Sequence, residues 1–149
     1  MEFDRKFFMV AAAVIVAVLV VIAVLWFYVI PRTELVVTTA YHEGSTNAIN
    51  INVKLENRGT EDILDIRYEI EVRNETQAFI DETGNISQIS PGGSRQIKTY
   101  FFGNQFETYD IHVNLSFESK GTVFTEEFTH TNGRYMNEQW TDSISKTHL

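Results

Sequence analysis

The hydrophobic positions follow one pattern near the amino terminus and a different one in the rest of the chain. Residues 9–30, MVAAAVIVAVLVVIAVLWFYVI, are apolar throughout and contain no charged side chain. A helix of this length, rising about 1.5 Å per residue, covers the roughly 30 Å hydrocarbon core of a bilayer. The run therefore predicts one transmembrane α-helix over residues 9–30, which Pro31 ends.

A cleaved secretory signal is the main alternative for this run, because it lies near the amino terminus and follows two basic residues. The apolar core of a signal peptide usually spans about 7 to 15 residues and ends at a small-x-small cleavage site. Residues 9–30 are longer than that and end in bulky side chains, Trp26 and Tyr28 among them. We therefore expect a retained signal-anchor, with Trp26 and Tyr28 at a membrane interface.

The orientation of the helix depends on few charges. Arg5 and Lys6 precede the span, and Arg32 is the one basic residue that follows it closely. The positive-inside rule therefore predicts a short cytoplasmic segment, residues 1–8, and a carboxyl-terminal domain outside the cytoplasm at the cell membrane.

After Thr33 apolar and polar residues alternate, most clearly over residues 49–55 and 64–72. This period of two is typical of a strand with one buried face and one solvated face. The same pattern, with turn residues at 44–45, 84–85, 91–93 and 103–104, predicts further strands at 35–41, 77–81, 95–102, 109–118 and 122–130. We therefore predict an all-β fold, a seven-stranded β-sandwich over residues 34–131.

The phase of the three clearest strands predicts the core. Its members share the inward-facing positions and are Ile51, Val53, Leu55, Ile66, Tyr68, Ile70, Ile111, Val113 and Leu115.

Lys120-Gly121 predicts a two-residue hairpin loop, and its register pairs Phe117 with Phe124. The same register turns Glu126 toward the core. Glu126 is therefore expected either to protect an edge strand as an inward charge or to be turned outward by a bulge.

Three segments resemble a known family. They are ININVKLENRGTEDILDIRYEIEV, two strands around Asn-x-Gly-Thr, then ISQISPGGSRQI and TYDIHVNLSF. Together, over about residues 35–131, they resemble the immunoglobulin-like, cell-adhesion-related (CARDB-like) domains of bacterial and archaeal surface proteins. The resemblance implies a sandwich that binds other molecules, and it makes Tyr109 the structural tyrosine of a corner between strands.

Composition and motifs provide no reaction chemistry. The formal charge of -8 disfavours nucleic acid as a partner, and the chain contains no cysteine. Ser94 is expected to be a turn residue, the four histidines solvated surface groups, and residues 81–85 a plain turn rather than a calcium loop. We therefore expect no catalytic residues, no metal site and no cofactor.

Asn74, Asn85 and Asn114 each begin an Asn-x-Ser/Thr sequon and are predicted glycosylation sites in a host that modifies exported proteins. Residues 132–149 form a polar carboxyl-terminal tail without a clear period, and a frayed tail is the default expectation. Tyr135 and Trp140 make it more apolar than an inert tail requires. These two residues are candidate partner contacts, with an extra strand or packing on the sandwich as the alternative.

The sequence favours a non-enzymatic, membrane-tethered interaction or adhesion module whose partner is a protein in or near the membrane or cell envelope. Such a module would serve as an accessory or structural subunit of an envelope or surface-filament assembly. The alternative is a substrate-binding module or an enzyme whose site is assembled from dispersed loop residues. An exposed aromatic patch would favour the first, and a cleft with convergent carboxylates or histidines the second.

Overall fold

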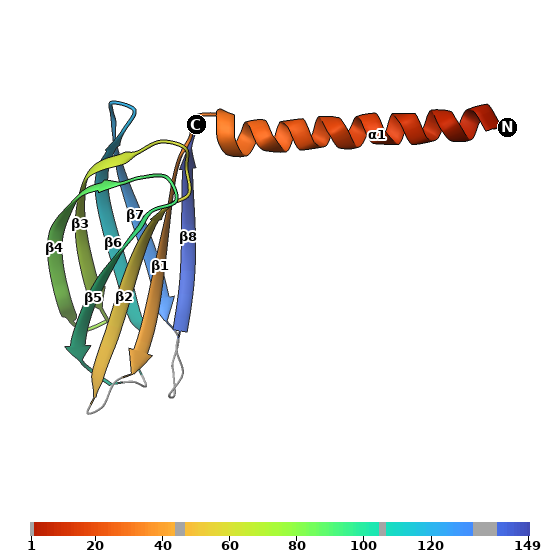
Figure 1. Cartoon of the computed structure of the whole chain (residues 1–149). Coiled ribbons are helices and arrows are strands. Elements are labelled where there is room, and N and C mark those ends of the chain that lie inside the picture. Colours follow the sequence, from red (N-terminus) through yellow and green to blue (C-terminus); the bar gives the residue numbers. More distant parts are fainter. Residues whose placement is uncertain (1, 44–46, 105–106, 133–139) are drawn as a thin grey trace. The chain divides into compact units, whose positions relative to one another are not determined.

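The computed structural model describes residues 2–43, 47–104, 107–132 and 140–149. The chain divides into two compact units, Met1–Pro31 and Arg32–Leu149. The first contains the apolar helix and the second contains every strand (Figure 1).

The apolar run forms an α-helix, α1 (Glu2–Val24), continued by one wider π-type turn, η1 (Leu25–Val29). Over Asp4–Val29 it is long and apolar enough to cross a membrane. The helix begins earlier than predicted, since residues 2–8 are helical too. It ends before Pro31 as predicted: Ile30 takes an extended backbone, because a proline ring disfavours the helical conformation of the residue before it.

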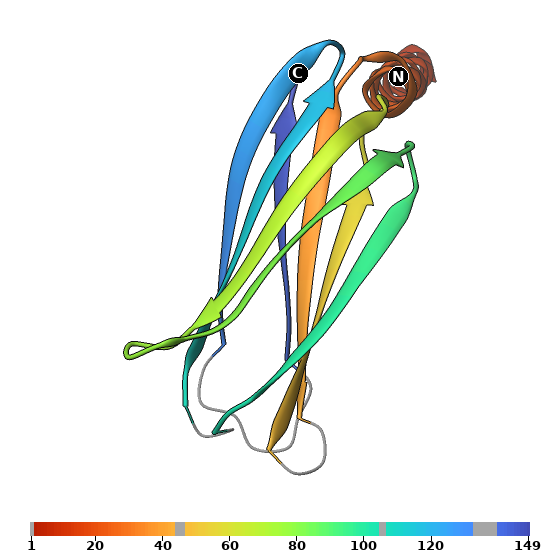
Figure 2. The same ribbon diagram turned by 90° about the vertical axis from the view of Figure 1, so that its left-hand side faces the viewer.

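In the described residues eight strands form two four-stranded antiparallel sheets that pack face to face as a β-sandwich (Figures 1 and 2). Sheet A has the order β5-β2-β1-β8 and sheet B the order β4-β3-β6-β7. The strands of sheet A are β1 (Thr33–Glu43), β2 (Ala48–Asn57), β5 (Ser94–Phe102) and β8 (Trp140–His148). Those of sheet B are β3 (Ile63–Arg73), β4 (Ala78–Ile89), β6 (Tyr109–Ser119) and β7 (Thr122–Asn132).

The prediction of seven strands is wrong by one. Residues 140–148, expected to belong to a frayed tail, pair with Thr33–Tyr41 of β1 as the edge strand of sheet A. They lack a clear apolar period because three of their inward-facing residues, Asp142, Lys146 and His148, contact polar side chains of β7, as described below. The extra-strand alternative is the one that the structure supports.

Strand β4 is also longer than predicted. The expected turn at 84–85 lies inside it, and the strand runs on to Ile89. Glycine and asparagine are usually turn residues, but here both continue the ladder with β3, Asn85 opposite Arg67 and Gly84 opposite Tyr68.

The predicted core is confirmed. Eight of its nine members are at most 1% exposed, and Tyr68 is half-buried against them. Both sheets contribute, and the largest fully buried side chains include Tyr41, Tyr109, Phe117 and Phe128. The alternation of apolar and polar residues was sufficient to assign the inner faces of β2, β3 and β6.

Gly84 allows Tyr68 to pack. A Cβ at this position would overlap the Tyr68 ring and hydroxyl. The ring therefore lies across the Gly84 backbone of the neighbouring strand, in the way that an aromatic side chain covers a glycine across a sheet.

We expect Gly84→Ala to displace the Tyr68 ring and lower the free energy of unfolding by about 1–3 kcal/mol, the usual cost of overpacking. In a Tyr68→Ala background the same glycine substitution should cost almost nothing, because the overlapping ring is gone. Denaturant unfolding of the four proteins of this cycle measures the coupling. Equal costs of Gly84→Ala in both backgrounds would contradict the packing role.

Candidate interaction surfaces

The Asn-x-Gly-Thr segment is a structural clamp where the chain enters the sandwich. Asn57 is fully buried, and its side-chain amide donates to the carbonyls of Glu61 at 2.8 Å and Ile89 at 2.9 Å. Its Oδ1 accepts the Gly59 N–H at 2.9 Å. Thr60 Oγ1 accepts the Arg32 N–H at 2.9 Å. One buried amide thus joins the β2–β3 loop to the end of β4, and the same loop holds the first residue of the domain.

Position 59 of this clamp has no room for a side chain, so only glycine fits there. A Cβ there would lie 2.5 Å from the carbonyl oxygen of Arg32 and 2.7 Å from the nitrogen of Glu34. The Asn57 backbone also exchanges hydrogen bonds with Gly92 and Gly93 of the β4–β5 turn, at 2.8 and 3.0 Å. The two turn motifs noted in the sequence therefore meet at one end of the sandwich and stabilise it together.

Tyr109 opens β6 and is fully buried. Its hydroxyl donates to the carbonyl of Asn104, five residues upstream, at 2.6 Å. Burial raises the pKa of the Tyr109 phenol, and the charge of Glu107 acts in the same direction. This hydrogen bond links the start of β6 to a residue that lies just after the end of β5, so Tyr109 has the structural role predicted for it.

Glu126 lies on a polar seam between the edge strands β7 and β8, formed by inward-facing Glu126 and His130 on one side and Asp142, Lys146 and His148 on the other. The Glu126 carboxylate contacts Lys146 Nζ at 3.0 Å and His148 Nε2 at 2.6 Å. The β6–β7 register contains no bulge, so the inward-charge alternative is confirmed. The partners of Glu126 come from the strand that the sequence did not predict.

Aromatic contacts complete the polar seam. The Lys146 ammonium lies 4.7 Å from the centre of the Phe128 ring, and the His148 ring stacks on Phe124 at 4.5 Å. His130 is fully buried, with Nδ1 3.0 Å from Asp142 Oδ2. The expectation of a solvated histidine is therefore wrong for His130, because an edge strand folds over it.

The charges of the seam shift two pKa values. Burial lowers the pKa of His130, and the hydrogen bond and charge of Asp142 only partly offset this effect. Burial acts to raise the pKa of Glu126, but the hydrogen bonds and charges of Lys146 and His148 outweigh it, and that pKa is lowered. In the folded protein the seam therefore favours a neutral His130 and an ionised Glu126.

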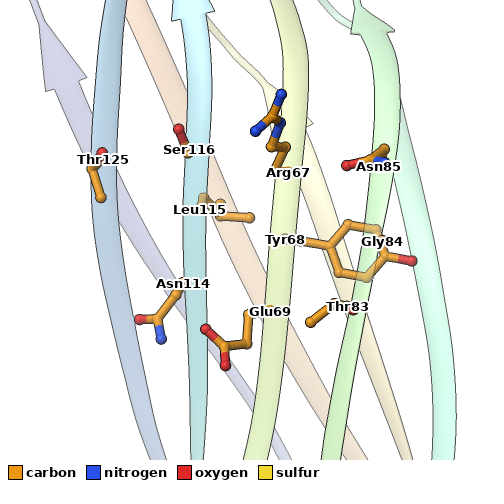
Figure 3. Close-up of a pocket in the computed structure, with 10 residues that line it drawn as sticks. All are labelled: Arg67, Tyr68, Glu69, Thr83, Gly84, Asn85, Asn114, Leu115, Ser116 and Thr125. Atoms are coloured by element: carbon orange, nitrogen blue, oxygen red, sulfur yellow. The ribbon is translucent and has the colours of Figure 1, made fainter.

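A groove of about 470 Å³ crosses the outer face of sheet B (Figure 3). Its side chains come from all four strands and are mainly hydroxyls and amides around one guanidinium and one carboxylate. The lining residues are Arg67, Tyr68, Glu69, Thr83, Gly84, Asn85, Asn114, Leu115, Ser116 and Thr125. Cross-strand register places Asn85 and Ser116 directly beside Arg67, one on each side.

Further along the same face the polar side chains are bonded to one another. Arg73 Nε donates to His112 Nε2 at 3.2 Å, and Arg73 also contacts the Glu71 carboxylate at 3.6 Å. His112 Nδ1 lies 3.2 Å from Thr129 Oγ1. This part of the face is a closed network, in contrast to the groove.

The outer face of sheet A carries an exposed aromatic pair. Tyr100 and Phe102 are 62% and 66% exposed, and their rings meet edge to face with centroids 5.9 Å apart. They lie on β5, which pairs with β2 alone and so is an edge strand. In the described part of the sandwich the other exposed large hydrophobic residues are Val123 and Leu149. The pair could not be predicted from the sequence, because local patterns do not show which strand lies at the edge of a sheet.

The three sequons fall in different settings. Asn74 lies in the turn between β3 and β4, where its Oδ1 accepts the Thr76 hydroxyl at 2.9 Å. Asn85 and Asn114 lie within strands and line the groove on sheet B. Glycosylation of all three stays a prediction.

The structure does not describe the side chains of the two candidate partner contacts in the tail. Tyr135 lies outside the described residues. Trp140 is the first residue of β8, with its backbone opposite Tyr41, and its side chain also lies outside the described part. Their role in partner contact stays a prediction.

The residues considered for chemistry remain dispersed. Ser94 opens β5 at the surface, and residues 81–85 are strand rather than turn. Across the described ranges no three His, Asp or Glu side chains are grouped to hold a metal ion.

No protein-family model matches the chain, and no curated protein matches it. Among solved structures, a protein from Archaeoglobus fulgidus is 14% identical, with a TM-score of 0.40; the match covers 70% of this chain and 94% of that one. A structural-genomics target determined by X-ray methods is 9% identical with a TM-score of 0.41, over 74% of this chain and 85% of that one.

Acid should destabilise the sandwich in two pH ranges. A lowered histidine pKa means that the unfolded state binds a proton first, so His130 loses its contribution as pH falls below about 6.5. Glu126 contributes fully above about 4.5, and its contribution is lost as pH falls further toward its lowered pKa. Denaturant unfolding of the full chain in detergent, from pH 8 to pH 3, measures both.

As the pH falls below about 4.5, the free energy of unfolding of the Glu126→Gln variant should decrease less than that of the unaltered protein, because glutamine has no carboxylate to protonate. Glu127→Gln is the matched control, because Glu127 is the next residue on β7 and points to the other face, with its side chain 63% exposed. Identical acid dependence of the two variants would contradict the role of the seam.

Proposed function

We propose that this protein is a single-pass membrane protein whose immunoglobulin-like, cell-adhesion-related sandwich lies outside the cytoplasm and binds a protein partner in the cell envelope. It binds and does not catalyse. The observation that carries the proposal is the aromatic pair, Tyr100 and Phe102, on the outer face of an edge strand.

The order of the strands supports an immunoglobulin-like topology. Strands β1, β2 and β5 share one sheet and β3, β6 and β7 the other. Immunoglobulin-type sandwiches divide their strands A, B and E from C, F and G in the same way. The Tyr109 hydroxyl, bonded to the backbone five residues upstream at the start of the sixth strand, matches the tyrosine corner of that fold.

The aromatic pair has the chemistry of a protein-binding surface. Tyrosine and other large aromatic side chains are enriched among the residues that dominate binding energy, because they bury much area with few rotatable bonds. An edge strand also offers unpaired backbone groups that can hydrogen-bond to an extended segment of another chain. Side-chain and backbone recognition are therefore available on the same strand, β5.

A membrane anchor would support partner binding, because it keeps the sandwich close to other proteins of the same membrane. The apolar helix ends at Val29 and the sandwich unit begins at Arg32, so the connection is short. Tethering a binding domain to a bilayer raises its effective concentration toward other proteins of that membrane. A weak contact at the aromatic pair can then be sufficient.

The membrane orientation is tested with epitopes at Met1 and after Leu149. Protease added to intact spheroplasts should remove the carboxyl-terminal epitope and spare the one at Met1, because Arg5 and Lys6 favour a cytoplasmic amino terminus. Detergent-permeabilised cells, where both epitopes become accessible, are the control. Protection of the carboxyl-terminal epitope with loss of the other would reverse the orientation.

Partner contact is tested by site-specific photocrosslinking in cells that produce the protein naturally. A photoreactive phenylalanine at position 100 or 102 should form an adduct, and Tyr100→Ser with Phe102→Ser should abolish partner co-purification at unchanged thermal stability. The control position is Val123, which is 67% exposed on sheet B. Equal adducts at position 123, or none at 100 and 102, would contradict the proposed surface.

A further inference from the structure

Arg67 occupies an unusual position in the groove on sheet B. It lies on β3, a central strand, and its direct cross-strand neighbours are the uncharged Asn85 on β4 and Ser116 on β6. Within the described residues no hydrogen bond or ion pair joins its guanidinium to another group. A charged fork with five N–H donors is thus open to solvent in a domain of net negative charge.

The groove around Arg67 differs from the closed network on the same face. There Arg73 contacts Glu71 and His112, so its charge is already compensated. In the groove the side chains of Asn85, Asn114 and Ser116 also make no hydrogen bond to other described residues. Polar groups in a hollow surface with unused donors and acceptors can bind a polar ligand by replacing water.

The chemistry of the groove selects the kind of ligand. The central strands β3 and β6 are paired on both sides, so their backbones cannot receive an extended peptide as an additional strand. Recognition must then come from side chains, which here are hydroxyls, amides, one carboxylate and one guanidinium. Hydroxyl and amide groups match the hydroxyls of a sugar, and a guanidinium matches a carboxylate through two parallel hydrogen bonds.

We propose that this groove binds a saccharide bearing a carboxylate, with Arg67 holding the carboxylate and Asn85, Ser116 and Thr125 holding hydroxyls. Glu69, which also lines the groove, accepts hydrogen bonds from ligand hydroxyls and disfavours ligands with a dense run of negative charge. Asn85 and Asn114 lie in the same groove, so a glycan attached to either would occupy it. The site is on sheet B and is independent of partner binding by the aromatic pair on sheet A.

The test uses the full chain in detergent micelles, produced in a host without N-glycosylation so that the groove is open. Calorimetric titration compares uronic-acid trimers, of galacturonate and of glucuronate, with their neutral trimers of the same linkage. At least one uronic-acid trimer should bind, and Arg67→Gln should weaken it by about 10- to 100-fold, the value of one charge-assisted pair. Arg95→Gln, the same charge change on sheet A, should leave the affinity unchanged.

Four results would overturn the proposal. Neither uronic-acid trimer binds at millimolar concentration, or a neutral trimer binds as tightly as its acidic counterpart. Arg67→Gln and Arg95→Gln have the same effect, which would mean that net charge rather than the groove attracts the ligand. Triglutamate binds at least as tightly as the trimers, which would make the occupant an acidic peptide.

Discussion

Strand register is the constraint on which the rest of this sandwich depends. Side chains alternate between the two faces of a strand, so a slip of one residue exchanges the buried set for the solvated set. The two-residue loop at Lys120-Gly121, with φ angles of 53° and 73°, sets the register of β6 and β7 without a bulge. That register buries Phe117 and Phe128, and it also turns Glu126 inward, where a carboxylate is unfavourable without a partner.

Strand β8 provides the partners that the inward-facing carboxylate of Glu126 needs. It brings Lys146 and His148 to Glu126 and Asp142 to His130, so the edge strands of the two sheets are joined by the Lys146–Glu126 ion pair and by hydrogen bonds of the two histidines. Among the described side chains of β8, Ile144 packs against the core. The strand is therefore held by backbone pairing with β1 and by the polar seam, and its polar composition follows from that location.

The registers of the other strand pairs explain why the two outer faces differ. On sheet B strand pairing places the uncharged Asn85 and Ser116 on either side of Arg67 and leaves a groove with open hydrogen-bonding groups. On sheet A strand pairing points Tyr100 and Phe102 outward from an edge strand, and no other described strand covers them. The described part of the sandwich thus presents one polar and one aromatic surface, on opposite sheets.

Local patterns by themselves determined the apolar helix, the inner faces of β2, β3 and β6, and the Lys120-Gly121 hairpin, whose register left two alternatives for Glu126. These features depend on neighbours in the sequence, and a period of two or a continuous apolar run records them directly. The sequence did not reveal that β8 exists, that Gly84 continues a strand, or that His130 is buried. Nor did it identify Arg67 and the aromatic pair as surface sites. Each of these depends on which strands lie side by side: Asp142 and Lys146 replace the apolar period of β8 only because β7 faces them, and Gly84 is needed only because Tyr68 crosses it. Tertiary structure decided them, because contacts between residues distant in sequence leave no period in the chain.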